Sequence, residues 1–271
     1  MAEERLVPLT YADPARSLFG RAPLRFTATL LLILTVYAVS LRFVGFDLIK
    51  LWSGLPRLAH WAAKAWPPDV DDFRSLVTRA LETVAMAIIG TTIGAVIAAP
   101  CCILAAKNVT PIGFLYVPAR WFLNILRGID SFVFALLFVA AVGLGPFAGV
   151  LGVGLHSAGT IAKLWSEAIE AVEPGPLEAV ALTGANALKV IRYALIPDAL
   201  PNLASIALYV WEFNVRASTV LGVVGAGGIG QELKNSVDLL DFARVFTIII
   251  LILVMVTSID QLSAVLRRRL V

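Results

Sequence analysis

Two opposite charges stand inside one of the most apolar stretches of the chain. Glu212 and Arg216 lie four residues apart in the stretch 200–221, a spacing that places both side chains on one face of a helix. An ion surrounded by hydrocarbon is costly unless it is paired or hydrated. Two interpretations therefore stay open. Either the pair neutralises itself and fixes helix packing, or Arg216 faces an aqueous pathway and meets an anion there.

A histidine and a lysine form a second candidate site in the stretch 147–172. His156 and Lys163 are about two helical turns apart, so they lie near one face of the helix that this stretch predicts. A lone histidine in an apolar helix is more often a hydrogen-bonding partner in packing than a proton relay. Both interpretations stay open for this pair.

The cysteines and the motifs argue against enzymatic chemistry in this chain. Cys101 and Cys102 are adjacent in an apolar run, without a Cys-x-x-Cys or a His-rich tract, and predict packing residues and no metal site. The phosphate-binding pattern Gly-x-x-x-x-Gly-Lys-Ser/Thr is missing, so we expect the chain not to bind ATP itself. Gly-x-Ser-x-Gly and His-Glu-x-x-His are missing too, which leaves lipase and metalloprotease interpretations without a motif.

A glycine-rich stretch matches the spacing of a nucleotide-binding pattern but not the structural context that the pattern requires. Its glycines are Gly225, Gly227, Gly228 and Gly230. The Gly-x-Gly-x-x-Gly fingerprint has meaning after a strand and before a helix of a βαβ unit, whereas here an apolar run precedes it. We expect a flexible, closely packed outer loop, whose backbone N–H groups are also able to meet an anion.

The elements that must position these residues are membrane-spanning helices. Apolar residues make up 59% of the chain and charged residues 15%, against about 45–50% and about 25% in soluble domains. A helix needs roughly 20 apolar residues to cross a bilayer. The apolar runs near this length are 26–44, 79–106, 128–143, 147–172, 200–221 and 242–262. The sequence therefore predicts an all-α membrane protein with about six transmembrane helices, in which Gly90 and Gly94 permit a close helix–helix contact.

Four segments organise the chain. Residues 1–25 form a polar N-terminal tail, and residues 26–74 hold the first span and a Trp-containing segment that predicts an interfacial amphipathic helix. Residues 75–265 form the helical core, and residues 266–271 form a basic tail. Lys and Arg are more frequent in the tails and loops on the side of the two ends, so the positive-inside rule predicts that both termini are cytoplasmic.

The loop 173–197 is the most informative stretch of the chain. It is polar, helix-prone and interrupted by prolines, and it connects two predicted spans. Residues 176–194 predict a helix pair interrupted at Gly184, where glycine permits a sharp turn or a close contact with another chain. A protruding amphipathic helix is a common means of docking into a groove of a partner.

Four residues of this loop match a known pattern: Glu178, Ala179, Gly184 and Pro197. Their spacing resembles the Glu-Ala-Ala…Gly…Ile-x-Leu-Pro motif of the permease subunits of bacterial binding-protein-dependent ABC importers, which have the type I importer fold. The chain departs from the motif by apolar replacements at three positions: Val180, Ala194 and Ile196. The resemblance implies that this loop is a coupling helix seated in a cleft of an ATPase subunit.

The resemblance covers roughly residues 75–265 and is most specific for the phosphonate-type permeases. The passages that carry it are 163–170, 211–222 and 225–230. It implies a cargo such as phosphonate, phosphate or a related oxyanion, moved by alternating access. It also makes four residues candidates to line the translocation pathway: Glu212, Arg216, His156 and Lys163.

Partners and location follow from the same resemblance. It implies a homodimer of two permease copies in the cytoplasmic (inner) membrane, two ATPase subunits that bind ATP and Mg, and an extracytoplasmic substrate-binding protein. The chain itself is expected to be non-catalytic, to hold no cofactor or metal, and to bind no nucleic acid. Two rivals stay open: a secondary transporter or channel without an ATPase, which often shows an internal repeat, and an intramembrane enzyme with converging catalytic groups.

Overall fold

The computed structural model describes residues 22–110 and 113–270, in which every regular element is a helix. The chain divides into two compact units, and the division falls between His60 and Trp61. The helices are α1 (Ala22–Val44), α2 (Leu48–Lys64), α3 (Phe73–Ala105), α4 (Gly113–Gly128), α5 (Ser131–Val142), α6 (Pro146–Glu170), α7 (Pro174–Leu182), α8 (Ala187–Val190), α9 (Ile196–Leu221), α10 (Gly228–Asp238) and α11 (Phe242–Leu270). A π-helical turn (Ile191–Leu195) joins α8 to α9, and a 3-10 turn (Gly222–Val224) follows α9.

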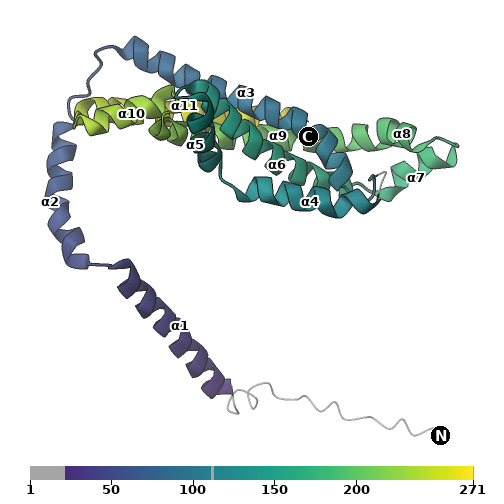
Figure 1. Ribbon diagram of the computed structural model, residues 1–271, viewed down its shortest axis with the longest axis horizontal. Coiled ribbons are helices and arrows are strands. Elements are labelled where there is room, and N and C mark those ends of the chain that lie inside the picture. The colour runs from purple at the N-terminus through teal and green to yellow at the C-terminus, as the bar shows by residue number, and fades with distance from the viewer. Residues whose placement is uncertain (1–21, 111–112, 271) are drawn as a thin grey trace, which may run out of the picture. The chain divides into compact units, whose positions relative to one another are not determined.

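Long helices lie side by side in the second unit. Figure 1 shows α3, α6, α9 and α11 running along one another, with α7 and α8 projecting at one end and α10 at the other. Five helical segments of the described chain are long and apolar enough to cross a membrane, or six if the bent pair of α4 and α5 counts as one span. This agrees with the expectation of about six spans in an all-α membrane protein.

The third expected span, 128–143, is not a single membrane-crossing helix. Helix α5 has 12 residues, so at 1.5 Å per residue it extends about 18 Å, short of the ~30 Å hydrocarbon core. The segment before it, expected as a connection with a short amphipathic piece, forms the 16-residue helix α4. The axes of α4 and α5 differ by 83°, so together they form a broken span or a re-entrant pair.

Helix α6 is the centre of the second unit, and small residues let other helices approach its backbone. A Cβ atom added to Gly94 of α3 would lie 2.6 Å from the Cβ of Ser157, so the contact predicted from the 90/94 glycine pair is present. A Cβ atom added to Gly159 would lie 2.6 Å from the Cβ of Leu126 in α4, and one added to Gly152 would lie 2.7 Å from a backbone nitrogen of α5. These positions accept no side chain without movement of the neighbouring helix.

The structure describes the expected end segments only in part. Residues 1–21 and 271 lie outside the described residues, so most of the expected tail 1–25 is not described. The expected first span and amphipathic segment within 26–74 correspond to α1 and α2. The basic residues expected in a tail at 266–271 belong to the last turn of α11, which continues to Leu270.

The close contact at Gly94 generates a stability prediction. We expect Gly94→Ala to destabilise the folded permease by about 1–3 kcal/mol, because overpacking forces α3 and α6 apart. The matched control is Gly175→Ala in α7, where an added Cβ has open space around it. The measurement is the thermal unfolding midpoint of each purified variant in detergent. Equal midpoints for the two variants would contradict the packing argument.

Candidate functional site

An ion network joins α9 to α11. The carboxylate of Glu212 accepts from Arg216 Nη2 at 2.7 Å within α9 and from Arg267 Nη2 of α11, also at 2.7 Å. Arg216 also lies 3.7 Å from Asp260 of α11. The expected pair of Glu212 and Arg216 is therefore present, but it belongs to a network of two acids and two bases. The partners from α11 were missed by sequence reasoning, which placed Arg267 in a separate tail.

Arg216 differs from Glu212 in its surroundings. The Glu212 side chain is 12% exposed, whereas the Arg216 side chain is 50% exposed. Arg216 lines a cavity of about 300 Å³ together with Asp130, Ser131 and Phe213. A half-exposed guanidinium in a candidate membrane span is costly against lipid. Its open side therefore requires water, an anion or another polar group.

Asn214 holds three helices together on the opposite side of α9. Its Nδ2 atom donates to Thr91 Oγ1 of α3 at 2.8 Å and to Ser157 Oγ of α6 at 2.7 Å. Asn214 and Ser157 are fully buried, and Thr91 is nearly so. Sequence reasoning missed this cluster, although a polar amide between two charged positions of a predicted span was a signal for it.

His156 and Lys163 make separate contacts and no common site. His156 Nδ1 lies 2.9 Å from the carbonyl oxygen of Ile129, at the break between α4 and α5. With its proton on Nδ1, the imidazole donates to a carbonyl that the broken helix leaves free. Lys163 pairs with Glu167 at 3.0 Å within α6. A role of His156 and Lys163 in the translocation pathway stays a prediction.

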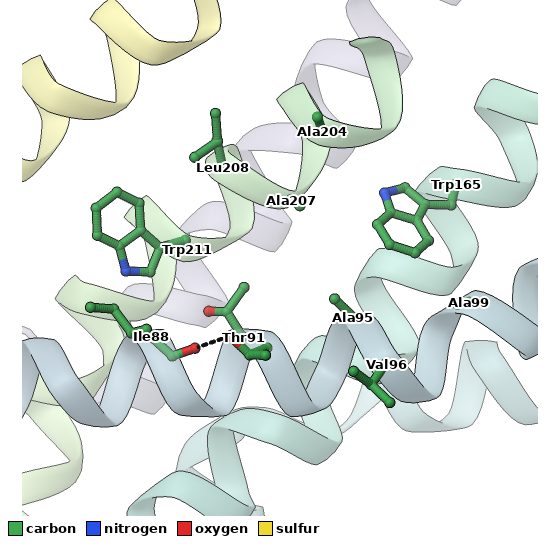
Figure 2. A pocket seen from close by; sticks show the side chains of 11 residues that line it. Ile88, Thr91, Ala95, Val96, Ala99, Trp165, Ala204, Ala207, Leu208 and Trp211 are labelled. Carbon is green, nitrogen blue, oxygen red and sulfur yellow. Dashed lines mark hydrogen bonds between the residues drawn. The ribbon is translucent and has the colours of Figure 1, made fainter. Parts of the chain in front are cut away.

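One groove in the described core is apolar. It has a volume of about 680 Å³ and lies between α3 and α9, with Trp165 of α6 at one end and Trp211 at the other (Figure 2). Between the two indoles the lining consists of small and aliphatic side chains such as Ala95 and Ala207. This groove offers no charged group to an oxyanion, so it is a poor candidate for a cargo site.

The glycine-rich stretch is a packed turn that leads into a helix. Gly225 and Gly227 have φ of +85° and +80°, in the left-handed region that glycine adopts readily. A Cβ atom added to Gly230 would lie 1.8 Å from the carbonyl oxygen of Thr219, because α10 folds back against the end of α9. The expectation of a loop across all four glycines is therefore corrected: Gly228 and Gly230 belong to the first turn of α10.

Three N–H groups of the glycine-rich stretch are used inside the protein. The N–H of Gly225 donates to the carbonyl of Gly222, and that of Ala226 donates to the carbonyl of Leu221. The N–H of Ile229 donates to Thr83 Oγ1 of α3 at 2.9 Å. The suggested anion contact would have to compete with these bonds.

The loop expected at 173–197 projects as two short helices. Helix α7 ends at Leu182, and Gly184, with φ of +81°, reverses the chain before α8. Glu178, Ala179 and Gly184 are exposed, and Leu182 is 88% exposed.

Pro197 lies in the first turn of α9, directly after the π-helical turn Ile191–Leu195. A proline cannot donate to the carbonyl four residues earlier, which is that of Tyr193. The chain therefore takes a wider turn before α9, as π-helical turns do where the regular hydrogen-bond ladder is interrupted.

Potential metal ligands are scattered in the described part of the chain. Within residues 22–110 and 113–270, no three His, Cys, Asp or Glu residues are grouped as a metal site would require. Cys101 is half-buried and Cys102 is buried, and both are free thiols.

Fold and site define a class of protein: a multi-span helical membrane protein with an ion network between two candidate spans, α9 and α11, and a helical loop that projects beyond the bundle (Figure 1). Residues 90–271 match the family described as the binding-protein-dependent transport system inner membrane component. The chain belongs to this family. It is therefore a multi-pass inner-membrane permease subunit of an ABC transporter, itself non-catalytic, whose partner ATPase binds ATP.

Individual relatives extend over nearly the whole chain. The chain is 49% identical to the putative phosphite transport system permease protein HtxC of Stutzerimonas stutzeri, over 97% of this chain and 93% of that protein. It is 40% identical to the phosphite transport system permease protein PtxC of the same organism, over 92% and 91%. Among solved structures, an inward-facing MetNI methionine ABC transporter matches with a TM-score of 0.65 and 26% identity, over 72% of this chain and 96% of that chain.

The buried Asn214 cluster generates a second prediction. We expect Asn214→Leu to lower the free energy of unfolding by about 1–3 kcal/mol, because two buried hydroxyl groups lose their hydrogen-bond donor. The control is Ser218→Ala, one turn further along α9, where a buried hydroxyl finds no partner among the described residues. Its removal should leave stability unchanged or raise it. Denaturation of both variants in detergent measures the difference, and equal losses would sink the assignment.

Proposed function

We propose that this chain forms the pathway through which an ABC importer carries a small phosphorus oxyanion such as phosphite, a phosphonate or phosphate. The observation that carries the proposal is Arg216, a half-exposed cation that lines a cavity within a candidate membrane span. The names of the relatives support the same class of cargo, since two of them are described as phosphite transport permeases.

The charges around Arg216 suit an anion that must be released again. Moving an oxyanion out of water into a protein cavity is unfavourable without a compensating charge or hydrogen bonds. A bare arginine would hold such an anion tightly. Glu212 and Asp260 lie near Arg216 and reduce the positive potential around it. The anion therefore binds weakly enough to be released.

The assembly in this proposal has two copies of the chain, two ATPase subunits and an extracytoplasmic binding protein. Both termini face the cytoplasm, as the distribution of basic residues supports. Helices α7 and α8 dock on the ATPase through exposed residues that include Glu178, Ala179 and Leu182. Closure of the ATPases on ATP moves these loops together, and the pathway opens outward to receive the cargo. Hydrolysis then restores the inward-open state.

The docking loop is tested by a single exposed side chain. We expect Leu182→Asp to abolish the stimulation of ATP hydrolysis by the loaded binding protein. The reason is that a charge in the contact weakens the binding of α7 and α8 to the ATPase subunit. The unfolding midpoint should not change, since the side chain is 88% exposed. Leu182→Met is the matched control and should keep stimulation. Full stimulation of the Leu182→Asp complex in proteoliposomes would refute the docking role.

The role of Arg216 is tested by two double variants that each keep the network neutral. Glu212→Gln/Arg216→Gln removes one acid and one base and leaves Asp260 with Arg267. Glu212→Gln/Arg267→Gln also removes one acid and one base and leaves Arg216 with Asp260. We expect the first variant to assemble, keep basal ATP hydrolysis and lose phosphite uptake at least about tenfold, a difference of ~1.4 kcal/mol or more. The second variant should transport.

Uptake of radiolabelled phosphite, phosphate and a methylphosphonate into proteoliposomes measures both double variants. Comparable uptake by the two well-assembled complexes would reduce the network to a packing device and remove Arg216 from the pathway. Loss of uptake in both would assign the requirement to Glu212. Wild-type uptake of none of the three anions would overturn the proposed class of cargo.

A further inference from the structure

A second charged cluster lies at the base of the docking loop, away from the Arg216 network. The carboxylate of Glu170, the last residue of α6, accepts from Arg120 Nη2 of α4 at 2.7 Å. Its other oxygen accepts from the backbone N–H of Lys107 at 2.7 Å. Arg120 Nε donates to the carbonyl oxygen of Ala105 at 3.1 Å. One ion pair therefore joins the ends of α3 and α6 to the middle of α4.

The cluster is more than a surface ion pair. The side chains of Arg120 and Glu170 are 24% and 26% exposed, and each makes a second hydrogen bond to backbone groups. The carbonyl of Ala105 stands at the end of α3, where helices have free carbonyls and favour cations. Asn108 Nδ2 adds a bond of 2.9 Å to the carbonyl of Ile169. The junction therefore fixes the C-terminal ends of α3 and α6 relative to α4.

The junction stands directly before the docking loop. Helix α7 begins at Pro174, shortly after Glu170. A cavity of about 320 Å³ separates the loop from the turn after α3, with Asn108, Leu177 and Ala181 in its lining. Beside this cavity, Leu177 packs on an apolar cluster that includes Ile169 at the end of α6. The residue that ends α6, Glu170, is held by Arg120. A displacement of α7 therefore reaches the bundle through the end of α6, as well as through the π-helical turn that leads into α9.

The far end of α4 lies beside the candidate pathway. Helix α4 runs alongside α6 (Figure 1) and ends at Gly128. The next residue, Ile129, is bonded through its carbonyl to His156. Asp130 follows, caps α5 by accepting from the N–H of Phe132 at 2.8 Å, and lines the cavity of Arg216. Helix α4 therefore spans the distance from the docking loop to the Arg216 cavity.

We infer that the Arg120–Glu170 pair is the joint that transmits movement of the docking loop to α4, and through α4 to the start of α5 beside Arg216. This inference rests on the docking role proposed for α7 and α8, and it is independent of the cargo. Arg120 and Glu170 are positioning residues: they touch neither ATP nor the transported anion. When the pair is broken, α7 still moves with the ATPase, but this movement is no longer transmitted to α5.

The experiment follows α7 and α5 separately in the complete complex. Backbone hydrogen–deuterium exchange is measured by mass spectrometry before and after the ATPases are trapped with ATP and vanadate. In the wild type we expect trapping to change exchange in both helices. In Arg120→Gln and Glu170→Gln we expect the change in α7 to persist and the change in α5 to fall at least about fivefold.

The matched control is Glu167→Gln. It makes the same substitution on α6 three residues before Glu170, but the pair that it breaks, with Lys163, lies within α6 itself. It should respond like the wild type in both helices. If the glutamine variants fail to assemble, Glu170→Asp replaces them, because a shorter carboxylate arm cannot reach Arg120 and Lys107 together. A weakened α5 response is expected for that variant too.

Three results would overturn the joint. The first is a full α5 response in an assembled Arg120→Gln, Glu170→Gln or Glu170→Asp complex. The second is an equal loss in α7 and α5 with a lower unfolding midpoint, which assigns the pair to stability alone. The third is a wild-type complex in which trapping changes α5 but not α7, and this result also refutes the docking role itself. Loss of oxyanion uptake does not enter this test, so failure of the proposed cargo is distinguishable from failure of the joint.

Discussion

Close approach of helix backbones to α6 is the constraint on which the rest of the second unit depends. The hydrophobic effect does not drive two apolar helices together in lipid, because lipid tails are as apolar as the helices. Van der Waals packing at small residues and hydrogen bonds between helices must supply the attraction. The glycines at 94, 152 and 159 permit that approach to α3, α5 and α4. Asn214 then binds α9 to Thr91 of α3 and to Ser157 of α6, and Ser157 is also the residue that Gly94 approaches. The polar contacts would not reach one another if α6 carried larger side chains.

With the bundle held this way, charged residues can occupy defined places within it. Glu212 is satisfied by arginines from two helices, and Glu170 is satisfied by Arg120 and a backbone N–H. Arg216 is paired with Glu212 as well, but half of its side chain remains open toward a cavity. A cation that lines a cavity within a candidate span is suited to an anionic cargo, which is the basis of the proposed function.

The broken span connects the two ends of this arrangement. Helix α4 begins toward the end of the bundle from which α7 and α8 project (Figure 1), and α5 begins beside Arg216, with a bend of 83° between α4 and α5. His156 stabilises that bend by bonding the carbonyl of Ile129, which gives this histidine a role in packing. A continuous helix through residues 113–142 would lack this bend, and the start of α5 would not line the Arg216 cavity.

The sequence by itself determined the membrane class, the approximate number of spans, the Gly90/Gly94 contact, the reversal at Gly184 and the pairing of Glu212 with Arg216. All of these depend on hydropathy or on residues within a few positions of one another, where helix geometry leaves little choice. Tertiary structure alone decided the α4–α5 bend, helix α10, and the partners of Glu212, Asn214 and Glu170. Asn214 contacts Thr91, 123 residues earlier in the chain, and Arg267 contacts Glu212, 55 residues away. Such pairs are chosen by which helix faces pack together, and the periodicity of a single helix carries no information about the face of its neighbour.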